Sequence, residues 1–297
     1  MFVPPEVVAI RTFAAVTTCH AAGYAEHGRR MVETFGQHWP SEVPLLLYAE
    51  GFVPDPYPCL QVHDLLADCP ELVAFKARHA DNPLAHGKTR RFRPKLALKA
   101  KPPWIKIKGR NWGDGYRWNA VRFAHKVYAI LHAARQVDAD VLIWIDADTA
   151  FFADVDLARL ERYMPPDRMV GFLERPRNTH TECGFVSYNL RHAGIQRFLV
   201  EFEAMYTNDE LFDEYEFHDS FLFDVVRRRA EARGDLGHDI AEGIGHRASH
   251  VLINSSLGEF MDHMKGNRKE AGTSRADDLV VKRDEAYWQR MKKPDQP

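Results

Sequence analysis

The sequence predicts an α/β protein in which a mostly parallel sheet is flanked by helices. Apolar runs of strand length alternate with amphipathic segments of helix length, which is typical of parallel strands joined by right-handed crossovers. One strongly apolar run ends in a pair of aspartates, at the position where open α/β sheets bind their ligands. The chain has 297 residues, 45% of them hydrophobic. We therefore expect a single domain over 1–297, with a basic insertion at 83–113 and a C-terminal extension at 270–297.

The first half of the chain contains three expected strands. Residues 7–17 form an apolar run that ends in polar residues, which is typical of a buried strand that delivers side chains to a site. Prolines and basic residues predict an irregular segment at 83–113. The remaining elements expected here are a helix at 24–35, a strand at 43–48, a weaker strand at 60–63 and a helix at 118–136.

The clearest predicted strand, 141–145, is followed by Asp146-Ala147-Asp148. Residues two apart on an extended chain point to the same side, so both carboxylates can serve one cation. Hard oxygen ligands of this kind suit Mn²⁺ or Mg²⁺. A lone Asp-x-Asp triplet can also cap a helix or solvate a turn. Further along we expect strands at 169–173 and 184–188, and helices at 195–206 and 220–232.

Two motifs carry a resemblance to a known family. Residues 143–155, IWIDADTAFFADV, resemble the aspartate motif of GT-A glycosyltransferases, and residues 263–269, HMKGNRK, are similar to the HxxGxxK pattern of the glycogenin and bacterial lipopolysaccharide galactosyltransferase group. The resemblance implies a Rossmann-like GT-A fold, a divalent metal held by Asp146, Asp148 and His263, and a nucleotide-sugar donor, in particular a UDP-sugar. It also implies transfer with retention of configuration. On its own, HxxGxxK is more often a basic surface turn.

The same resemblance suggests residues that contact the donor. Glycine permits close approach of the backbone, and lysine neutralises the leaving diphosphate. An acid near the anomeric carbon is expected at Asp219, with Glu182 as a competitor, although Asp219 can equally be the N-cap of a helix that begins at 220. The residues expected to contact the donor are Thr17, Thr18, Arg122, Lys126, Gly184, Lys265, Gly266 and Lys269.

The charge distribution bears on the acceptor. A net charge of −2 excludes a globally basic nucleic-acid binder, so any recognition of a polyanion must be local. Residues 83–113 contain ten lysines and arginines and no acid, with aromatic residues between them. This pattern predicts a nucleic acid, such as modified DNA, or another polyanion as a partner of 86–110. Alternatively, the acidic segment 201–224 neutralises the insertion.

Two other classes of function remain open from the sequence. A phosphatase of the haloacid-dehalogenase type also has a strand that ends in DxD, and a non-catalytic module would bind polyanions through the insertion alone. The four cysteines contain no CxxC pair, the first residues do not resemble a signal peptide, and no apolar run is long enough to span a membrane. We therefore expect a cytoplasmic protein without a membrane partner.

Overall fold

A seven-stranded sheet runs through the middle of the molecule in a computed structural model, which describes residues 11–88, 115–175, 180–244 and 250–290. The strand order is β3-β2-β1-β4-β7-β6-β8. Four of the strand pairings in this sheet are parallel and two are antiparallel. The mostly parallel α/β fold that the sequence predicts is therefore confirmed. The strands are β1 (Phe13–His20), β2 (Leu45–Glu50), β3 (Leu60–Asp64), β4 (Val141–Ile145), β6 (Val170–Leu173), β7 (Glu182–Asn189) and β8 (His238–Asp239).

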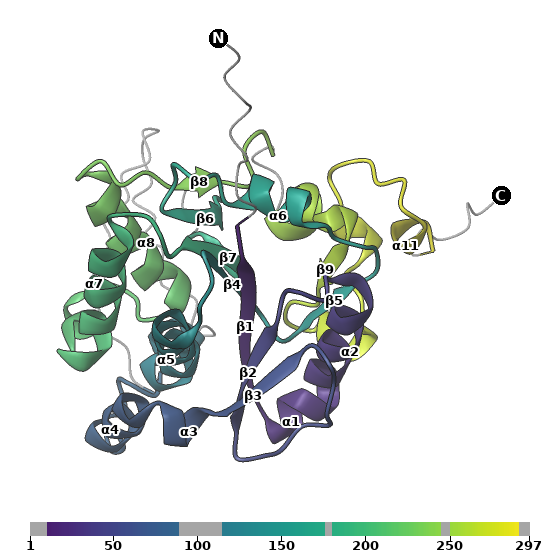
Figure 1. The fold of residues 1–297 in the computed structure, drawn as a ribbon. Coiled ribbons are helices and arrows are strands. Elements are labelled where there is room, and N and C mark those ends of the chain that lie inside the picture. The colour runs from purple at the N-terminus through teal and green to yellow at the C-terminus, as the bar shows by residue number, and fades with distance from the viewer. Residues whose placement is uncertain (1–10, 89–114, 176–179, 245–249, 291–297) are drawn as a thin grey trace, which may run out of the picture.

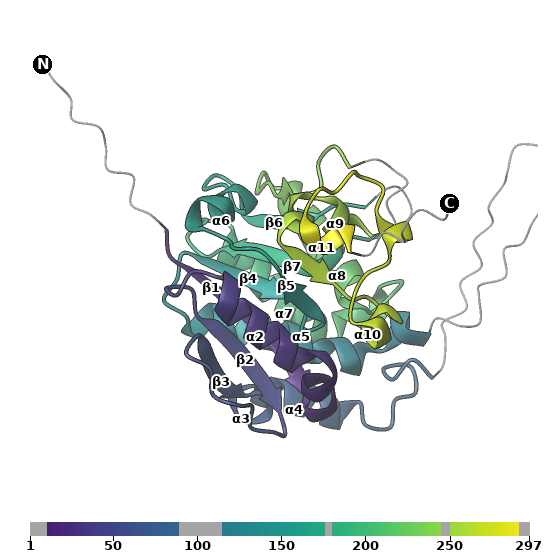
Figure 2. The same cartoon turned by 90° about the vertical axis from the view of Figure 1, so that its right-hand side faces the viewer.

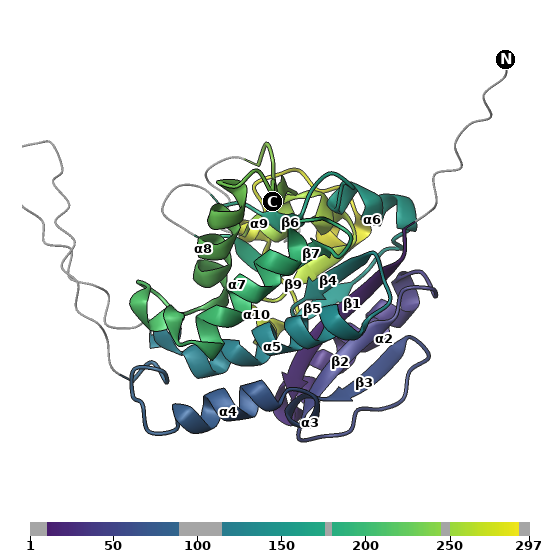
Figure 3. The same cartoon turned by 60° about the vertical axis from the view of Figure 1, so that its left-hand side comes forward.

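One face of the sheet is covered by a layer of helices that includes the longest helix among the described residues (Figures 1 and 3). Buried side chains from this layer and from the sheet form one large apolar core. The helices of this layer are α3 (Leu65–Asp68), α4 (Pro70–Arg78), α5 (Ala120–Gln136), α7 (Ile195–Thr207) and α8 (Asp219–Glu231).

The opposite face is covered by further helices and by a small second sheet (Figure 2). These elements enclose a second apolar core. They are α2 (Arg29–His38), α6 (Leu157–Tyr163), α9 (Val251–Asn254), α11 (Ala286–Gln289) and the strands β5 (Thr149–Phe151) and β9 (Met261–His263). Short helical turns complete the chain at α1 (Ala21–Gly23), η1 (Tyr24–Gly28), η2 (Gly115–Trp118), η3 (Glu210–Asp213), η4 (Ser256–Glu259), α10 (Arg268–Ala271) and η5 (Ala276–Asp278).

Helix α5 and strand β4 form for reasons that are visible in the sequence. The side chain of Asn119 accepts a hydrogen bond from the backbone N–H of Arg122 at 3.1 Å and so caps the start of α5. The helix buries an apolar stripe against the sheet and ends at Val137, which is extended. All five residues of β4 are buried, as a central strand with helices on both faces requires.

Several predicted boundaries need correction. The strand expected at 7–17 begins at Phe13 and continues to His20, while residues 7–10 lie outside the described part of the chain. The helix expected at 24–35 is the middle of a longer helical run from Ala21 to His38, which contains a π-helical turn at η1. Helix α8 begins at Asp219, one residue before the predicted start.

The two segments expected outside the core differ in how much of them is described. Of the basic insertion at 83–113, only 83–88 is described and forms turns; residues 89–113 lie outside the described ranges. The described part of the C-terminal extension packs onto the second core, where the fully buried Trp288 donates its indole N–H to the carbonyl of Gly258 at 2.6 Å. Among the described residues, no helix has both the length and the apolar character needed to cross a membrane.

Candidate metal centre and its pocket

The two aspartates of the DxD motif follow the last residue of β4, at the edge of the central sheet. Directly after them, β5 pairs antiparallel with β9, so that Thr149 lies opposite His263. This pairing brings the imidazole Nε2 of His263 to 3.1 Å from Asp148 Oδ1 and 3.5 Å from Asp146 Oδ2. The three predicted metal ligands thus converge, with one donor atom from each lying within 4.8 Å of the other two.

Asp148 is held in its ionised form by two neighbours. Burial alone would raise the pKa of this carboxyl, but His263 and the Lys269 ammonium, 2.9 Å from Oδ2, outweigh burial and hold the pKa well below its usual range. Burial would likewise lower the pKa of His263, yet Asp148 and the other nearby carboxylates raise it. Asp148 is therefore a carboxylate that lies between the His263 ring and the Lys269 ammonium.

Gly184 makes room for His263. A Cβ atom at this position would lie 2.6 Å from Cε1 and Nδ1 of the His263 ring, closer than side chains pack. Gly184 is part of the buried strand β7. The absence of a side chain at 184 thus makes room for the imidazole. The sequence predicted a glycine here for another reason, namely contact with the donor.

Lys126 connects the DxD motif to helix α8. Its ammonium lies 3.1 Å from Asp146 Oδ1 and 2.7 Å from Asp219 Oδ2, and it donates to the carbonyl of Cys183 at 2.6 Å. It also lies 4.7 Å from the centre of the Trp144 ring, whose indole N–H donates to Asp146 at 2.7 Å. Burial would lower the pKa of Lys126, but the two carboxylates outweigh burial and raise it. The ammonium is therefore a fixed charge in the wall of the site.

Asp219 is the first residue of α8, and the N-cap position belongs to His218. The alternative that Asp219 caps a helix beginning at 220 is therefore wrong. Its carboxylate is instead paired with Lys126, and this pairing outweighs burial and lowers the pKa of Asp219. The carboxylate is ionised and lies in the pocket wall.

Glu182, the second acid considered near the reacting carbon, is buried at the start of β7. Both Arg175 and Lys265 form ion pairs with its Oε2 atom. Burial would raise the pKa of Glu182, but these two cations and His263 hold it well below its usual range. One carboxylate between two cations leaves a net positive charge at this side of the pocket.

The predicted residues gather around a cleft of about 770 Å³ at the ends of β1 and β4. Thr18, whose hydroxyl donates to the Tyr48 carbonyl at 2.6 Å, lines the cleft. Thr17 does not, because it points into the core and is 1% exposed. The other predicted residues in the wall are Arg122, Lys126, Asp146, Asp148, Glu182, Asp219, Lys265 and Lys269. His263 lies behind this wall, and Gly266 is exposed in a turn with a positive φ of 61°.

The sequence reasoning missed several residues of the cleft. His27 lies in the π-helical turn, and its pKa is lowered, first by burial and then by Lys269. Arg175 follows the predicted strand at 169–173 closely, and a basic residue just beyond a strand end is a signal that could have been used. His180 and His218 both lie close to Glu216, with Nε2 atoms 3.4 and 3.0 Å from its Oε2.

Comparisons with known proteins give a likeness of fold. No protein-family model matches the chain, and no curated protein matches its sequence. Mouse xyloside xylosyltransferase 1, in its apo form, is 12% identical with a TM-score of 0.42, and the match covers 76% of this chain and 84% of that one. The bifunctional glycosyltransferase WbbM is 10% identical with a TM-score of 0.44, over 79% of this chain and 39% of that one.

A third similar structure is the glycosyltransferase GlyE of Streptococcus pneumoniae TIGR4, which is 11% identical with a TM-score of 0.41, over 77% of this chain and 45% of that one. The chain thus spans less than half the length of WbbM and of GlyE. All three structures are glycosyltransferases. At these identities and TM-scores the likeness assigns no activity, so the activity has to be argued from the side chains of the cleft.

Proposed function

We propose that this chain is a metal-dependent glycosyltransferase that uses a nucleotide diphosphate sugar. The observation that carries the proposal is the convergence of Asp146, Asp148 and His263 at the end of β4, beside a cleft with lysines at its wall. These residues come from two motifs, and the pairing of β5 with β9 joins them.

The donor set fits a divalent cation. Two carboxylates and one imidazole lie within reach of one ion, and Gly184 leaves the imidazole space to face the aspartates. Oxygen donors with one nitrogen suit Mn²⁺, and Mg²⁺ to a lesser degree. A cation bound by these three residues would supply positive charge to the diphosphate oxygens of the donor as the leaving group develops negative charge.

The lysines of the cleft are suited to binding the diphosphate. Lys269 neutralises Asp148 at 2.9 Å, and it becomes available to a phosphate oxygen once a cation occupies the carboxylate. Lys265 and Arg175 both pair with Glu182, so two positive charges face one negative charge and one positive charge is left to attract a phosphate. Arg122 is exposed at the wall of the cleft and forms no ion pair with any described residue, so its guanidinium can meet the nucleotide or a phosphate.

In the proposed transfer, the bond between the anomeric carbon and the diphosphate oxygen breaks, and a bond from the acceptor hydroxyl oxygen to that carbon forms. The acceptor hydroxyl gives its proton to the oxygen of the departing diphosphate, and the nucleoside diphosphate leaves. Asp219 and Glu182 are both ionised, so neither serves as a proton donor. We assign Asp219 to electrostatic stabilisation of positive charge at the anomeric carbon. Its partner Lys126 is shared with Asp146, so one positive charge faces two carboxylates and part of the negative charge of Asp219 is left to act on the substrate. We assign Glu182 to positioning the two cations that bind phosphate.

The properties of Asp148 speak against a DxD phosphatase. In such an enzyme the second aspartate transfers a proton, which requires a pKa near the working pH. The pKa of Asp148 is instead held well below its usual range. The donor base, the retaining stereochemistry and a polyanionic acceptor remain part of the proposal by family resemblance and charge pattern. Of the segment 86–110 that would bind such an acceptor, residues 89–110 lie outside the described ranges.

Hydrolysis of the donor tests the proposal. Wild-type protein should slowly hydrolyse a UDP-sugar with Mn²⁺, and Asp148→Ala should reduce turnover by about 100-fold or more, because a metal contributes several kcal/mol of charge stabilisation. The matched control is Asp154→Ala, since Asp154 is six residues away and its side chain is 89% exposed. The control should retain wild-type turnover, and far-UV circular dichroism should verify that both variants are folded. Unchanged Mn²⁺-dependent turnover in the Asp148 variant would refute the metal assignment.

A further inference from the structure

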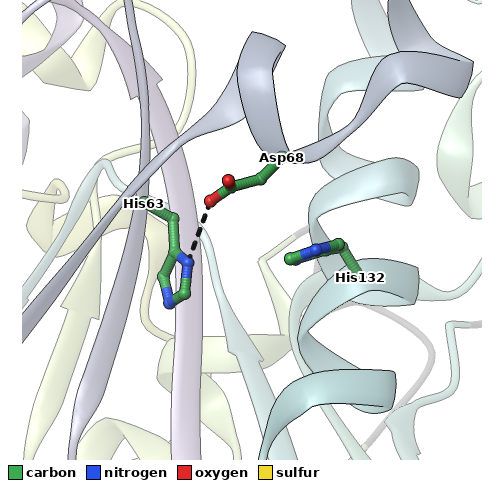
Figure 4. A group of neighbouring side chains, drawn as sticks. All are labelled: His63, Asp68 and His132. Atoms are coloured by element: carbon green, nitrogen blue, oxygen red, sulfur yellow. Dashed lines mark hydrogen bonds and ion pairs between the residues drawn. The ribbon is translucent and has the colours of Figure 1, made fainter.

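A second group of potential metal ligands lies apart from the cleft. His63 belongs to β3, Asp68 is the last residue of α3, and His132 lies on α5; Figure 4 shows the three side chains facing one another. None of the three lines the cleft that contains the DxD motif. A site here would join an edge strand of the sheet to the helical layer that covers it.

The geometry brings three donor atoms together. His63 Nδ1 lies 3.1 Å from Asp68 Oδ2, and one donor atom from each of the three residues lies within 4.8 Å of the other two. Zinc binds nitrogen and oxygen ligands at about 2.0–2.2 Å, so a small rotation of the side chains is needed to close the site. The side chains of His63 and Asp68 are 25% and 34% exposed, which allows this rotation and lets an ion enter from solvent.

Tyr48 orients both imidazoles. Its ring stacks on His63 with centroids 4.6 Å apart and an angle of 10° between the planes. Its hydroxyl lies 2.8 Å from Nδ1 of His132, so the other ring nitrogen, Nε2, remains available as a ligand. A hydrogen bond to the second nitrogen of a ligating histidine is the usual way in which proteins fix the tautomer and direction of the ring.

The donors and the local charge favour one class of ion. Two imidazoles and one carboxylate suit Zn²⁺ and Co²⁺, whereas Mn²⁺ and Mg²⁺ prefer sites that are richer in oxygen, such as the DxD site. Arg135 and Glu71 both act electrostatically on His132. The Arg135 guanidinium is itself paired with Glu203, so it does not leave an unbalanced positive charge against an incoming cation.

We propose that His63, Asp68 and His132 form a second metal site, which binds Zn²⁺ with three protein ligands. The bound ion ties β3, α3 and α5 together and leaves a fourth position for water. This inference does not rest on the proposed glycosyl transfer, because it concerns different residues and its test measures no activity.

The test is the binding of Co²⁺ as a spectroscopic substitute for Zn²⁺, with CoCl₂ titrated into tag-free protein. In an Asp146→Ala/Asp148→Ala background, which disables the first site, Co²⁺ should bind to the site at His63, Asp68 and His132, and ZnCl₂ should displace it and raise the melting temperature. The group of His180, Glu216 and His218 remains intact in this background, so the readout is the Co²⁺ binding that is lost when His132 is replaced. Adding His132→Ala should weaken this binding by at least about 100-fold, since loss of an outer-shell partner alone weakens metal binding by about 10- to 100-fold. MnCl₂ should not compete at the same concentration.

The matched control is His38→Ala. His38 pairs with Asp154 at 2.8 Å and its side chain is 24% exposed, close to the value for His63, but no third ligand joins this pair among the described residues. The control should bind Co²⁺ as its parent does. Equal Co²⁺ binding with and without His132 would overturn the proposal, as would an equal loss in the control. In otherwise wild-type protein, His132→Ala should lower the number of bound Co²⁺ ions by one, which does not depend on the stability of the aspartate variant.

Discussion

Replacing Lys126 with methionine should destabilise the protein by much more than loss of an ordinary surface lysine. The ammonium makes three contacts, with Asp146 at 3.1 Å, Asp219 at 2.7 Å and the carbonyl of Cys183 at 2.6 Å, so each of its N–H groups has an acceptor. The side chain of Asp219 is 13% exposed, and Lys126 is the cation paired with it among the described residues. Lys126→Met would leave this carboxylate buried without a counter-charge.

The expected cost follows from that uncompensated charge. Removing one partner of a buried ion pair destabilises proteins by about 3–5 kcal/mol. The second change Asp219→Asn removes the stranded charge, so the double variant should regain more than half of the loss. The control is Lys76→Met, because Lys76 pairs with Glu50 at a similar 2.8 Å but their side chains are 32% and 25% exposed. Its loss should be about 0–1 kcal/mol.

Urea unfolding in EDTA measures these differences without a cation that could compensate. The single variant at 126 should show a lower midpoint with an unchanged slope, and the double variant should show an intermediate midpoint. The reasoning fails if Lys126→Met costs less than the control at 76. It also fails if the double variant is as unstable as the single one, because the stranded carboxylate would then not be the cause.

Three further predictions concern the cleft. Gly184→Ala should weaken Mn²⁺ binding at least about tenfold by displacing the His263 ring, as calorimetry can measure, and equal affinity would contradict this role of the glycine. Lys269→Met should leave Mn²⁺ binding equal or tighter but weaken binding of UDP with Mn²⁺, whereas parallel losses would contradict the assignment to phosphate. Asp224, and then Glu216, raise the pKa of His180 to about 9. His180→Gln should therefore lower the free energy of unfolding by at most about 3 kcal/mol below pH 6.5, and by nothing once the pH exceeds 9. A loss of stability in urea titrations that does not depend on pH would exclude this linkage.

The sequence was most informative where local pattern determines structure. Strand β4 was predicted with its observed bounds, because five consecutive apolar residues leave a buried strand as the simplest interpretation. Helix α5 was predicted with an error of two residues at its start, where Trp118 belongs to a 3₁₀ turn and Asn119 is the cap. These two elements deliver Asp146 and Lys126, so the centre of the candidate site could be predicted from local signals.

Relations between distant residues could not be predicted in the same way. Asp219 and Lys126 were both proposed as site residues, but their ion pair depends on how α5 and α8 pack, which neither segment encodes alone. Strands β5 and β9 have three residues each, too few to show a periodicity. The group of His63, Asp68 and His132 was missed for the same reason, since His63 and His132 come together only through tertiary packing, in which α3 contacts both β3 and α5.

The pairing of β5 with β9 has a consequence for when the metal site can form and for how readily the C-terminal stretch is cleaved by proteases. Asp148 and His263 are 115 positions apart, so a chain that is still being synthesised, or one clipped by a protease before position 263, has both aspartates but no imidazole. An ion bound by all three residues would link the C-terminal stretch that contains His263 to the end of β4. Local opening of that stretch would release the ion, and the ion would in turn suppress the opening. Limited proteolysis of this stretch would thus report on metal occupancy even when no sugar is transferred.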